Sequence, residues 1–158
     1  MIMNNWFECK VQTQKQLDSG KIQKTVEPYL VDALNFTEAE ARIIKEVSSY
    51  CNGEMTVKDI KRVKYSELFQ TTDANADKWY KVKCNFIIFD EKSQKEKKTS
   101  SMMLDQASSV KDALKRFEEG MKGSMMDYEV AMVQETNLLD VFPYEPLVVA
   151  DEKPEYEQ

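Results

Sequence analysis

The sequence contains no histidine, and this absence removes several kinds of active site at once. Ser-His-Asp and Cys-His catalytic systems need an imidazole, and histidine is also the commonest metal ligand and the usual general base near neutral pH. Only four glycines are present, and none forms the GxGxxG or GxxxxGK loop that holds phosphate groups. The composition therefore favours a protein that is not an enzyme and that needs no metal ion and no cofactor.

Cysteine is scarce, and long apolar runs are missing. The three cysteines form no CxxC pair, and an odd number of thiols without a visible targeting segment indicates a reducing, cytoplasmic setting. Cys9 alternates with apolar residues, so we interpret it as a small core residue rather than a reactive thiol. No apolar stretch approaches the roughly 18 residues of a membrane span, and no membrane partner is expected.

Negative charge is concentrated at the end of the chain. The net charge of the 158 residues is −6, and segment 143–158 has five acidic residues against one lysine, which leaves about −2 for the remainder. A strongly acidic protein is a poor binder of nucleic acid, but a nearly neutral body weakens that objection. We expect 143–158 to be a flexible acidic tail that keeps the protein soluble, imitates a nucleic-acid strand or adds an edge strand at 147–149.

One short pattern occurs twice. Segment 6–11 (WFECKV) returns 73 residues later as 79–84 (WYKVKC), and at the same offset 65–69 (YSELF) falls on 138–142 (LLDVF). This repetition predicts an internal duplication, with the two copies at 4–69 and 79–142 and a polar linker at 70–77.

Apolar periodicity predicts the same elements in both copies. In chain order they are strands at 6–13 and 22–33, a helix from 36, a strand at 55–65, a strand at 79–89, a return strand ending at 104, a helix from 109 and a strand at 128–136. The predicted fold class is α+β, a tandem duplication of a strand-strand-helix-strand unit with antiparallel sheets packed on two helices. We expect the two copies to form one globular domain.

Both predicted helices begin with capping signals. Thr37 and Glu40 have the spacing of a capping box, and Ser109 and Asp112 repeat that arrangement. The expected buried residues are Ala41, Ile44, Val47 and Cys51 in the first helix, and Val110, Ala113, Leu114, Phe117 and Met121 in the second. Imperfect alternation in strand 55–65 predicts a β-bulge near 61–62.

The outward face of strand 79–89 is the candidate binding site, because aromatic, apolar and lysine side chains share it. Its residues are Trp79, Lys81, Lys83, Ile87 and Phe89, with Trp6 and Lys10 as the counterpart in the first copy. Single-stranded nucleic acid binds to such surfaces by stacking bases on aromatic rings and placing phosphates near lysines. The alternative is that the other copy, a helix or a second subunit covers this face, since so apolar a surface is unusual on a monomer.

A family resemblance extends over nearly the whole chain. It rests on segments 6–11 (WFECKV), 27–33 (EPYLVDA), 36–42 (FTEAEAR), 64–67 (KYSE), 78–82 (KWYKV) and 140–144 (DVFPY). The chain resembles the uncharacterised domain-of-unknown-function family DUF4494 of gut Bacteroidetes and their phages and mobile elements. The resemblance implies a small bacterial or phage protein, and it transfers no catalytic residue.

From these observations we predict a non-enzymatic binding module, with single-stranded nucleic acid as its most specific ligand. The alternative is a structural or protein-interaction protein, such as a homodimer or a phage accessory protein, with no role in nucleic-acid binding.

Overall fold

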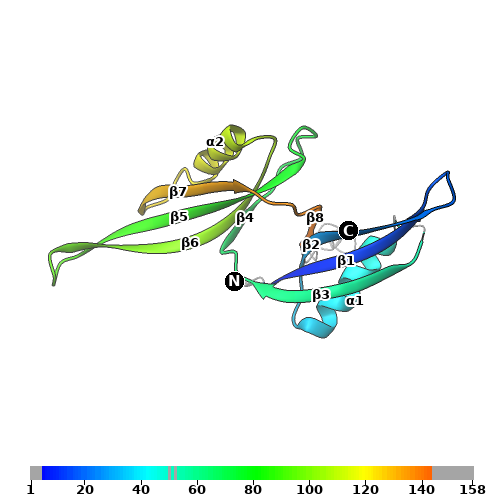
Figure 1. The fold of residues 1–158 in the computed structure, drawn as a ribbon. Coiled ribbons are helices and arrows are strands. Elements are labelled where there is room, and N and C mark those ends of the chain that lie inside the picture. The colour runs from blue at the N-terminus through cyan, green and yellow to red at the C-terminus, as the bar shows by residue number, and fades with distance from the viewer. Residues whose placement is uncertain (1–4, 50, 52, 144–158) are drawn as a thin grey trace, which may run out of the picture. The chain divides into compact units, whose positions relative to one another are not determined.

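The computed structural model describes residues 5–49, 51 and 53–143. Its elements, in chain order, are β1 (Trp6–Gln16), β2 (Ile22–Asp32), α1 (Phe36–Ser48), β3 (Met55–Val63), β4 (Glu67–Phe69), β5 (Lys78–Asp90), β6 (Lys95–Ala107), α2 (Val110–Gly120), β7 (Asp127–Glu135) and β8 (Asp140–Phe142). Within the described residues, two helices and two mixed sheets confirm the α+β class (Figure 1). Of the predicted acidic tail, 144–158 lies outside the described residues.

The chain divides into two units, each with one four-stranded sheet. Unit 1 is Met1–Val63 with Leu138–Gln158, and its strand order is β3-β1-β2-β8. Unit 2 is Lys64–Asn137, with the order β4-β6-β5-β7. These units differ from the contiguous copies expected at 4–69 and 79–142. The reason is that β4 pairs in parallel with β6, and β8 in parallel with β2, so each short strand lies in the sheet of the other predicted copy.

In unit 1, α1 packs on one face of the sheet, and its N-cap lies two residues earlier than the capping residue predicted from the sequence. Asn35, not Thr37, is the N-cap, and its side chain accepts a hydrogen bond from the Glu38 N–H at 2.8 Å. Its buried residues are Ala39, Ile43 and Val47, so Val47 of the predicted stripe is confirmed, whereas Ile44 is exposed. The buried core comprises Phe7, Cys9, Val11, Tyr29, Val31, Ala33, Ala39, Ile43 and Val47.

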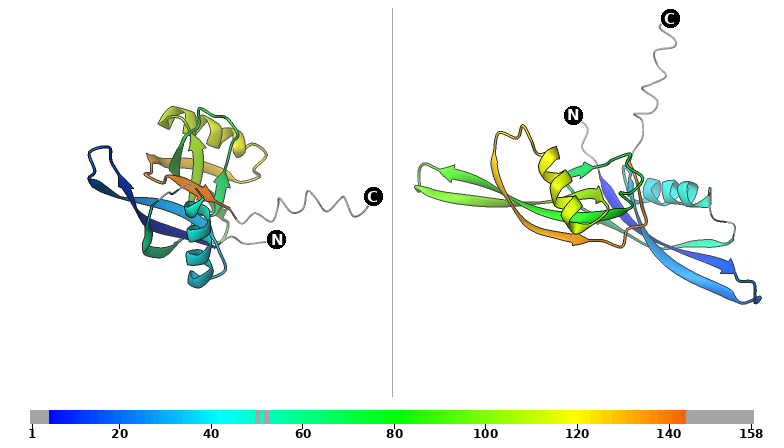
Figure 2. Two further views of the ribbon diagram at one scale, coloured as in Figure 1. Left: turned by 90° about the vertical axis from the view of Figure 1, so that its right-hand side faces the viewer. Right: turned by 90° about the horizontal axis from the view of Figure 1, so that it is seen from above.

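In unit 2, α2 covers the equivalent face of the second sheet (Figure 2). Ser109 is the N-cap and accepts a hydrogen bond from the Asp112 N–H at 3.1 Å, as the sequence predicts. Phe117 is fully buried and makes edge-to-face contacts with the rings of Phe69 and Tyr128. Val110 of the predicted stripe is exposed because it lies in the first turn of the helix.

The two units correspond closely in register. The β1–β3 ladder shifts after Lys10 and the β5–β7 ladder shifts after Lys83, so each contains one bulge. The extra residue of the first bulge is Lys58 rather than the predicted 61–62, and that of the second is Ala131. Both pairs of residue numbers differ by 73, the offset that also separates the similar sequence segments 6–11 and 79–84.

Candidate functional site

The structure buries both tryptophans that the sequence assigned to the outward face. Trp6 is 2% exposed and Trp79 is 4% exposed. A ring covered to that extent offers no face to a base, because stacking requires the ring surface to be open. The burial of both rings favours the alternative, in which another part of the protein covers this face, over stacking of bases on the tryptophans.

The other candidate residues retain some exposure. Lys81, Lys83 and Ile87 are half-buried, whereas Phe89 and Lys10 are exposed. Those on β5 share one face of the unit 2 sheet because residues two apart along a strand point the same way. Lys10 lies on β1 in unit 1. The structure thus leaves a candidate surface with one exposed aromatic ring, that of Phe89.

Acidic groups share this face with the lysines. The Lys98 ammonium lies 3.0 Å from Oε2 of Glu129, and Asn85 Nδ2 donates a hydrogen bond to the same oxygen at 3.3 Å. Ser100 Oγ donates to Asn85 Oδ1 at 2.8 Å. The hydrogen bonds from Lys98 and Asn85 lower the pKa of Glu129. Its charge offsets part of the positive charge that a phosphate backbone would require.

Beyond the end of β7, β5 and β6 continue as a two-stranded arm, which we define as residues 88–97. β7 pairs with β5 as far as Ile87, whereas β5–β6 pairing continues to Asp90 and Lys95. Figure 1 and the right-hand view of Figure 2 show β5 and β6 extending past β7. Ile88 and Phe89 are 44% and 55% exposed on opposite faces of the arm.

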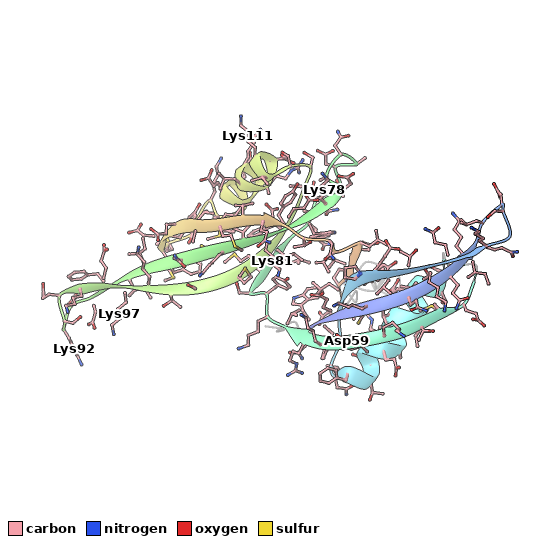
Figure 3. All side chains as sticks on the ribbon, viewed as in Figure 1. Asp59, Lys78, Lys81, Lys92, Lys97 and Lys111 are labelled. Carbon is pink, nitrogen blue, oxygen red and sulfur yellow. The ribbon has the colours of Figure 1, made fainter. Side chains whose placement is uncertain are left out.

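Lysines surround the exposed apolar side chains of the arm. Figure 3 shows Lys92 and Lys97 at its end. Lys97 lies 3.3 Å from the carboxylate of Asp90, and both groups are partly exposed. The arm contains three lysines and three acidic residues, so its net charge is zero, and a fourth lysine, Lys98, follows directly after it. The arm therefore combines exposed apolar side chains with lysines whose charge the acidic residues of the same segment balance.

A buried carboxyl group in unit 2 was not anticipated from the sequence. Asp105 on β6 is 1% exposed, and neither carboxyl oxygen has a hydrogen-bond partner among the described residues. Burial raises its pKa to about 7, with the positive charge of Arg116 opposing that shift and the negative charge of Asp112 adding to it. Near neutral pH this group is divided between its protonated and ionised forms.

Asp105 borders a hollow of about 380 Å³ within unit 2. The hollow lies where β4 and the loop after it meet β6 and α2, and its other lining residues are Leu68, Phe69, Gln70, Thr71, Gln106, Arg116, Glu119 and Gly120. A glycine at position 120 lets the helix approach the neighbouring ring, because an added Cβ would lie 2.7 Å from Phe69. The hollow is thus built from both polar and apolar groups.

The nearest cation does not neutralise Asp105 by a direct hydrogen bond. Arg116 donates from Nε to Asp112 Oδ2 at 2.8 Å, from one terminal nitrogen to Asp73 Oδ2 at 2.7 Å, and from the other to Thr71 Oγ1 at 3.2 Å. Hydrogen bonds to Asp112 and Asp73 raise the pKa of Arg116. Its charge is therefore shared with two carboxylates other than Asp105.

The buried thiols have the properties of core residues. Burial raises the pKa of Cys9 to about 12 and also raises that of Cys84, so both thiols stay protonated at neutral pH. All three cysteines are free. In the part of the chain that the structure describes, no three His, Cys, Asp or Glu side chains are grouped to hold a metal ion. None of the described helices is long and apolar enough to cross a membrane.

Comparison with protein families assigns the chain to a family, which its geometry alone does not do. Residues 5–144 match the family described as Domain of unknown function (DUF4494). The chain belongs to the DUF4494 family. No curated protein and no solved structure matches it. DUF4494 membership transfers no activity, so a functional proposal has to rest on the surfaces described above.

Proposed function

We propose that this chain is a non-enzymatic binding module and that it contacts its ligand through the β5–β6 arm and the adjoining outer face of β5. The observation that carries the proposal is the exposure of Ile88 and Phe89 on a segment that β7 does not support. Exposed apolar side chains at the end of a projecting hairpin lose contact with water when a partner covers them, and this favours association.

Single-stranded nucleic acid is the most specific ligand in this proposal. Phe89 supplies a ring on which a base can stack, and Lys81, Lys83 and Lys98 lie on the same face of the sheet. Because both tryptophans are buried and Glu129 offsets one lysine, we expect the affinity to be modest and to fall steeply with salt.

A protein partner is the alternative, and one observation favours it. Ile88 and Phe89 face opposite sides of the arm, so a nucleic-acid strand on one side leaves the other side chain uncovered. A groove on a second protein, including a second copy of this chain, can cover both sides. The proposal then becomes a structural or accessory protein with no role in nucleic-acid binding.

We also propose which kind of organism the protein comes from and how its two-unit fold arose. The resemblance to proteins of gut Bacteroidetes, their phages and mobile elements supports a bacterial or phage protein, and three free cysteines support a reducing cytoplasm. Duplication of one strand-strand-helix-strand unit is supported by the matching strand orders and by the bulges at Lys58 and Ala131. In this view, an exchange of the short final strands followed the duplication.

Fluorescence anisotropy with a labelled single-stranded DNA oligonucleotide tests the ligand. We expect saturable binding at low salt that weakens at moderate salt. Phe89→Ala should weaken it about tenfold, as expected for loss of one stacked base. Lys83→Ala should weaken it and reduce the salt dependence, whereas Lys122→Ala, on a loop away from this face, is the matched control and should bind normally.

Light scattering in the same buffer separates the two ligand classes. Nucleic-acid binding by a monomer supports the first proposal. A dimer that binds no oligonucleotide, and that dissociates when Phe89 and Ile88 are both changed to Ser, supports the protein-interaction proposal. A monomer that binds no oligonucleotide even at low salt excludes both nucleic acid and self-association as roles of the arm.

A further inference from the structure

Asp105 and Val31 occupy the same position in the two units. Val31 on β2 pairs with Phe7 and Phe142, and Asp105 on β6 pairs with Tyr80 and Phe69 in the corresponding ladders. Val31 is fully buried in an apolar core. The fold is therefore compatible with valine at this position, and packing alone gives no reason for a carboxyl group there.

A buried carboxyl group without a partner costs free energy of folding, because its oxygens lose the hydrogen bonds that water gives them. Unit 1 shows how such a group is normally satisfied: Asp32 is buried, and its Oδ1 accepts a hydrogen bond from the Asn5 N–H at 3.0 Å. Asp105 has no such donor among the described residues. An unsatisfied buried acceptor beside a hollow indicates a missing donor.

The charges around the hollow define the ligand. Glu119 lines it together with Asp105, and the cation of Arg116 is engaged by Asp112 and Asp73. These four carboxyl groups outnumber the one guanidinium, so the electrostatic potential in the hollow favours a positive ligand. Leu68 and Phe69 add an apolar wall on which the methylene groups of an amine can pack.

We propose that this hollow binds a compact organic cation, an ammonium or guanidinium group that donates hydrogen bonds to the carboxylate of Asp105. Two sources carry this chemistry: a free amine, and a lysine or arginine side chain of a partner. Since the Asp105 oxygens are sealed from water, entry requires a bordering side chain to move. Arg116, whose side chain is 25% exposed, can swing outward because one of the acids that hold it, Asp73, is itself exposed.

NMR titration of the isotope-labelled full chain with n-butylammonium chloride tests the proposal, at ionic strength held constant with KCl. We expect saturable shifts of amide resonances in β6, α2 and the loop after β4. We also expect the pKa of Asp105, read from its carboxyl ¹³C shift, to fall, because a bound cation favours the ionised form. Neutral n-butanol is the matched ligand control and should give no saturable shift at these residues.

Asp105→Val supplies the decisive variant, because valine is the residue that unit 1 has at this position. It should fold and weaken n-butylammonium binding about tenfold or more, as loss of a charge-assisted hydrogen bond predicts. Asp105→Asn preserves the shape of the side chain and should also bind more weakly. Asp127→Asn, which removes an exposed carboxylate on β7, should bind as the unmodified chain does.

The source of the cation is resolved by a second series of ligands. Tighter binding of Nα-acetyl-lysine methylamide or Nα-acetyl-arginine amide than of n-butylammonium points to a side chain of a partner, whereas the reverse order points to a free amine. Either order supports the site. The proposal is overturned if no cation gives a saturable shift in this region, if n-butanol acts equally, or if Asp105→Val and Asp105→Asn bind as tightly as the unmodified chain.

Discussion

Unit 1 and unit 2 are built on one plan and differ in what they place beneath the helix. Both have the same strand order, a bulge at the same register and a helix capped by a polar side chain. Beneath α1 the core is apolar at Val31, and beneath α2 the equivalent position is Asp105. Strand order, bulge and helix cap are common to both units and belong to the fold itself. The carboxyl group of Asp105 occurs in one unit only, so the fold does not require it.

The arginines of the two helices show the same contrast. Arg42 donates hydrogen bonds to the backbone carbonyls of Asp32 and Pro143, the latter at 3.2 Å, and so ties α1 to the strands of its own unit. Arg116 donates instead to the side chains of Asp112, Asp73 and Thr71 beside the hollow. Arg42 also lies 3.9 Å from the carboxylate of Glu46, so unit 1 combines backbone hydrogen bonds with one ion pair, whereas unit 2 has two ion pairs at the equivalent place on the helix.

The largest effect is expected from removing the main core side chain of each helix. Phe117→Ala should lower the free energy of unfolding by about 3–5 kcal/mol and Ile43→Ala by about 2–5 kcal/mol. Urea denaturation measures both losses. The chain has two tryptophans, Trp6 in unit 1 and Trp79 in unit 2, so Trp→Phe backgrounds allow each unit to be followed by fluorescence. A loss below about 1 kcal/mol in either variant would contradict the packing described.

The substitution Val31→Asp places a carboxyl group at the position of unit 1 that is equivalent to Asp105, and so tests how unit 1 responds to a buried acid. Val31→Asp should destabilise unit 1 by a few kcal/mol at pH 8, where the new carboxylate has to be buried in its charged form. The loss should be smaller at pH 5, because a buried carboxyl group with a raised pKa is protonated there. Urea denaturation of the variant at the two pH values measures this difference. Equal losses at both pH values would show that Val31 is not in an apolar, water-free position.

Helix capping gives the next effect in size. Asn35→Ala and Ser109→Ala should each cost about 1 kcal/mol of stability, since each removes the acceptor for an N–H in the first turn. Thr37→Ala is the matched control in unit 1, because Thr37 lies inside the helix rather than at its cap. Thermal denaturation measures the three variants. If Thr37→Ala costs more than Asn35→Ala, the position of the cap is wrong.

The smallest effect is expected at the surface of the unit 2 sheet. Lys98 and Glu129 form an ion pair in which both side chains are about half exposed. Glu129→Gln should change the free energy of unfolding by no more than about 1 kcal/mol, because water and salt screen such pairs. Urea denaturation at low and high salt measures this difference in the free energy of unfolding, which should become smaller as the salt concentration rises. A salt-independent loss of several kcal/mol would mean that this face is buried.

The sequence predicts the repeated part of the fold well because repetition and periodicity are local signals. Segments 6–11 and 79–84 locate two equivalent strands, and the hydroxyl of Ser109 marks the start of α2. The cap of α1 was assigned to Thr37 because Glu40 follows at the right spacing, but Asn35 and Glu38 have the same spacing and begin the helix. The predicted buried stripe was also partly wrong, because Ala39 and Ile43 are buried in place of Ala41 and Ile44.

The long-range pairing of the two short strands and the buried carboxyl group could not be predicted from local patterns. β4 and β8 have three residues each, and their parallel partners lie far along the chain. Trp79 stands among outward-facing lysines, so alternation alone assigned it to the surface. For Asp105, the sequence offset of 73 places Leu104 opposite Val31. Only the strand pairing of the structure, in which Phe7 pairs with Val31 and Tyr80 with Asp105, shows that the acid stands at the position of the core valine.

The most direct test of whether Asp105 is buried without a hydrogen-bond partner is its pKa, together with the effect of this carboxyl group on stability. With a folded pKa raised to about 7, the unfolded chain ionises first, so this group lowers stability increasingly from about pH 4 to pH 7. We predict a carboxyl ¹³C titration of Asp105 near pH 7 in the full chain. We also expect the Asp105→Val variant to be more stable than the unmodified chain above that pH. A measured pKa near 4, together with a variant that is less stable at every pH, would contradict both expectations.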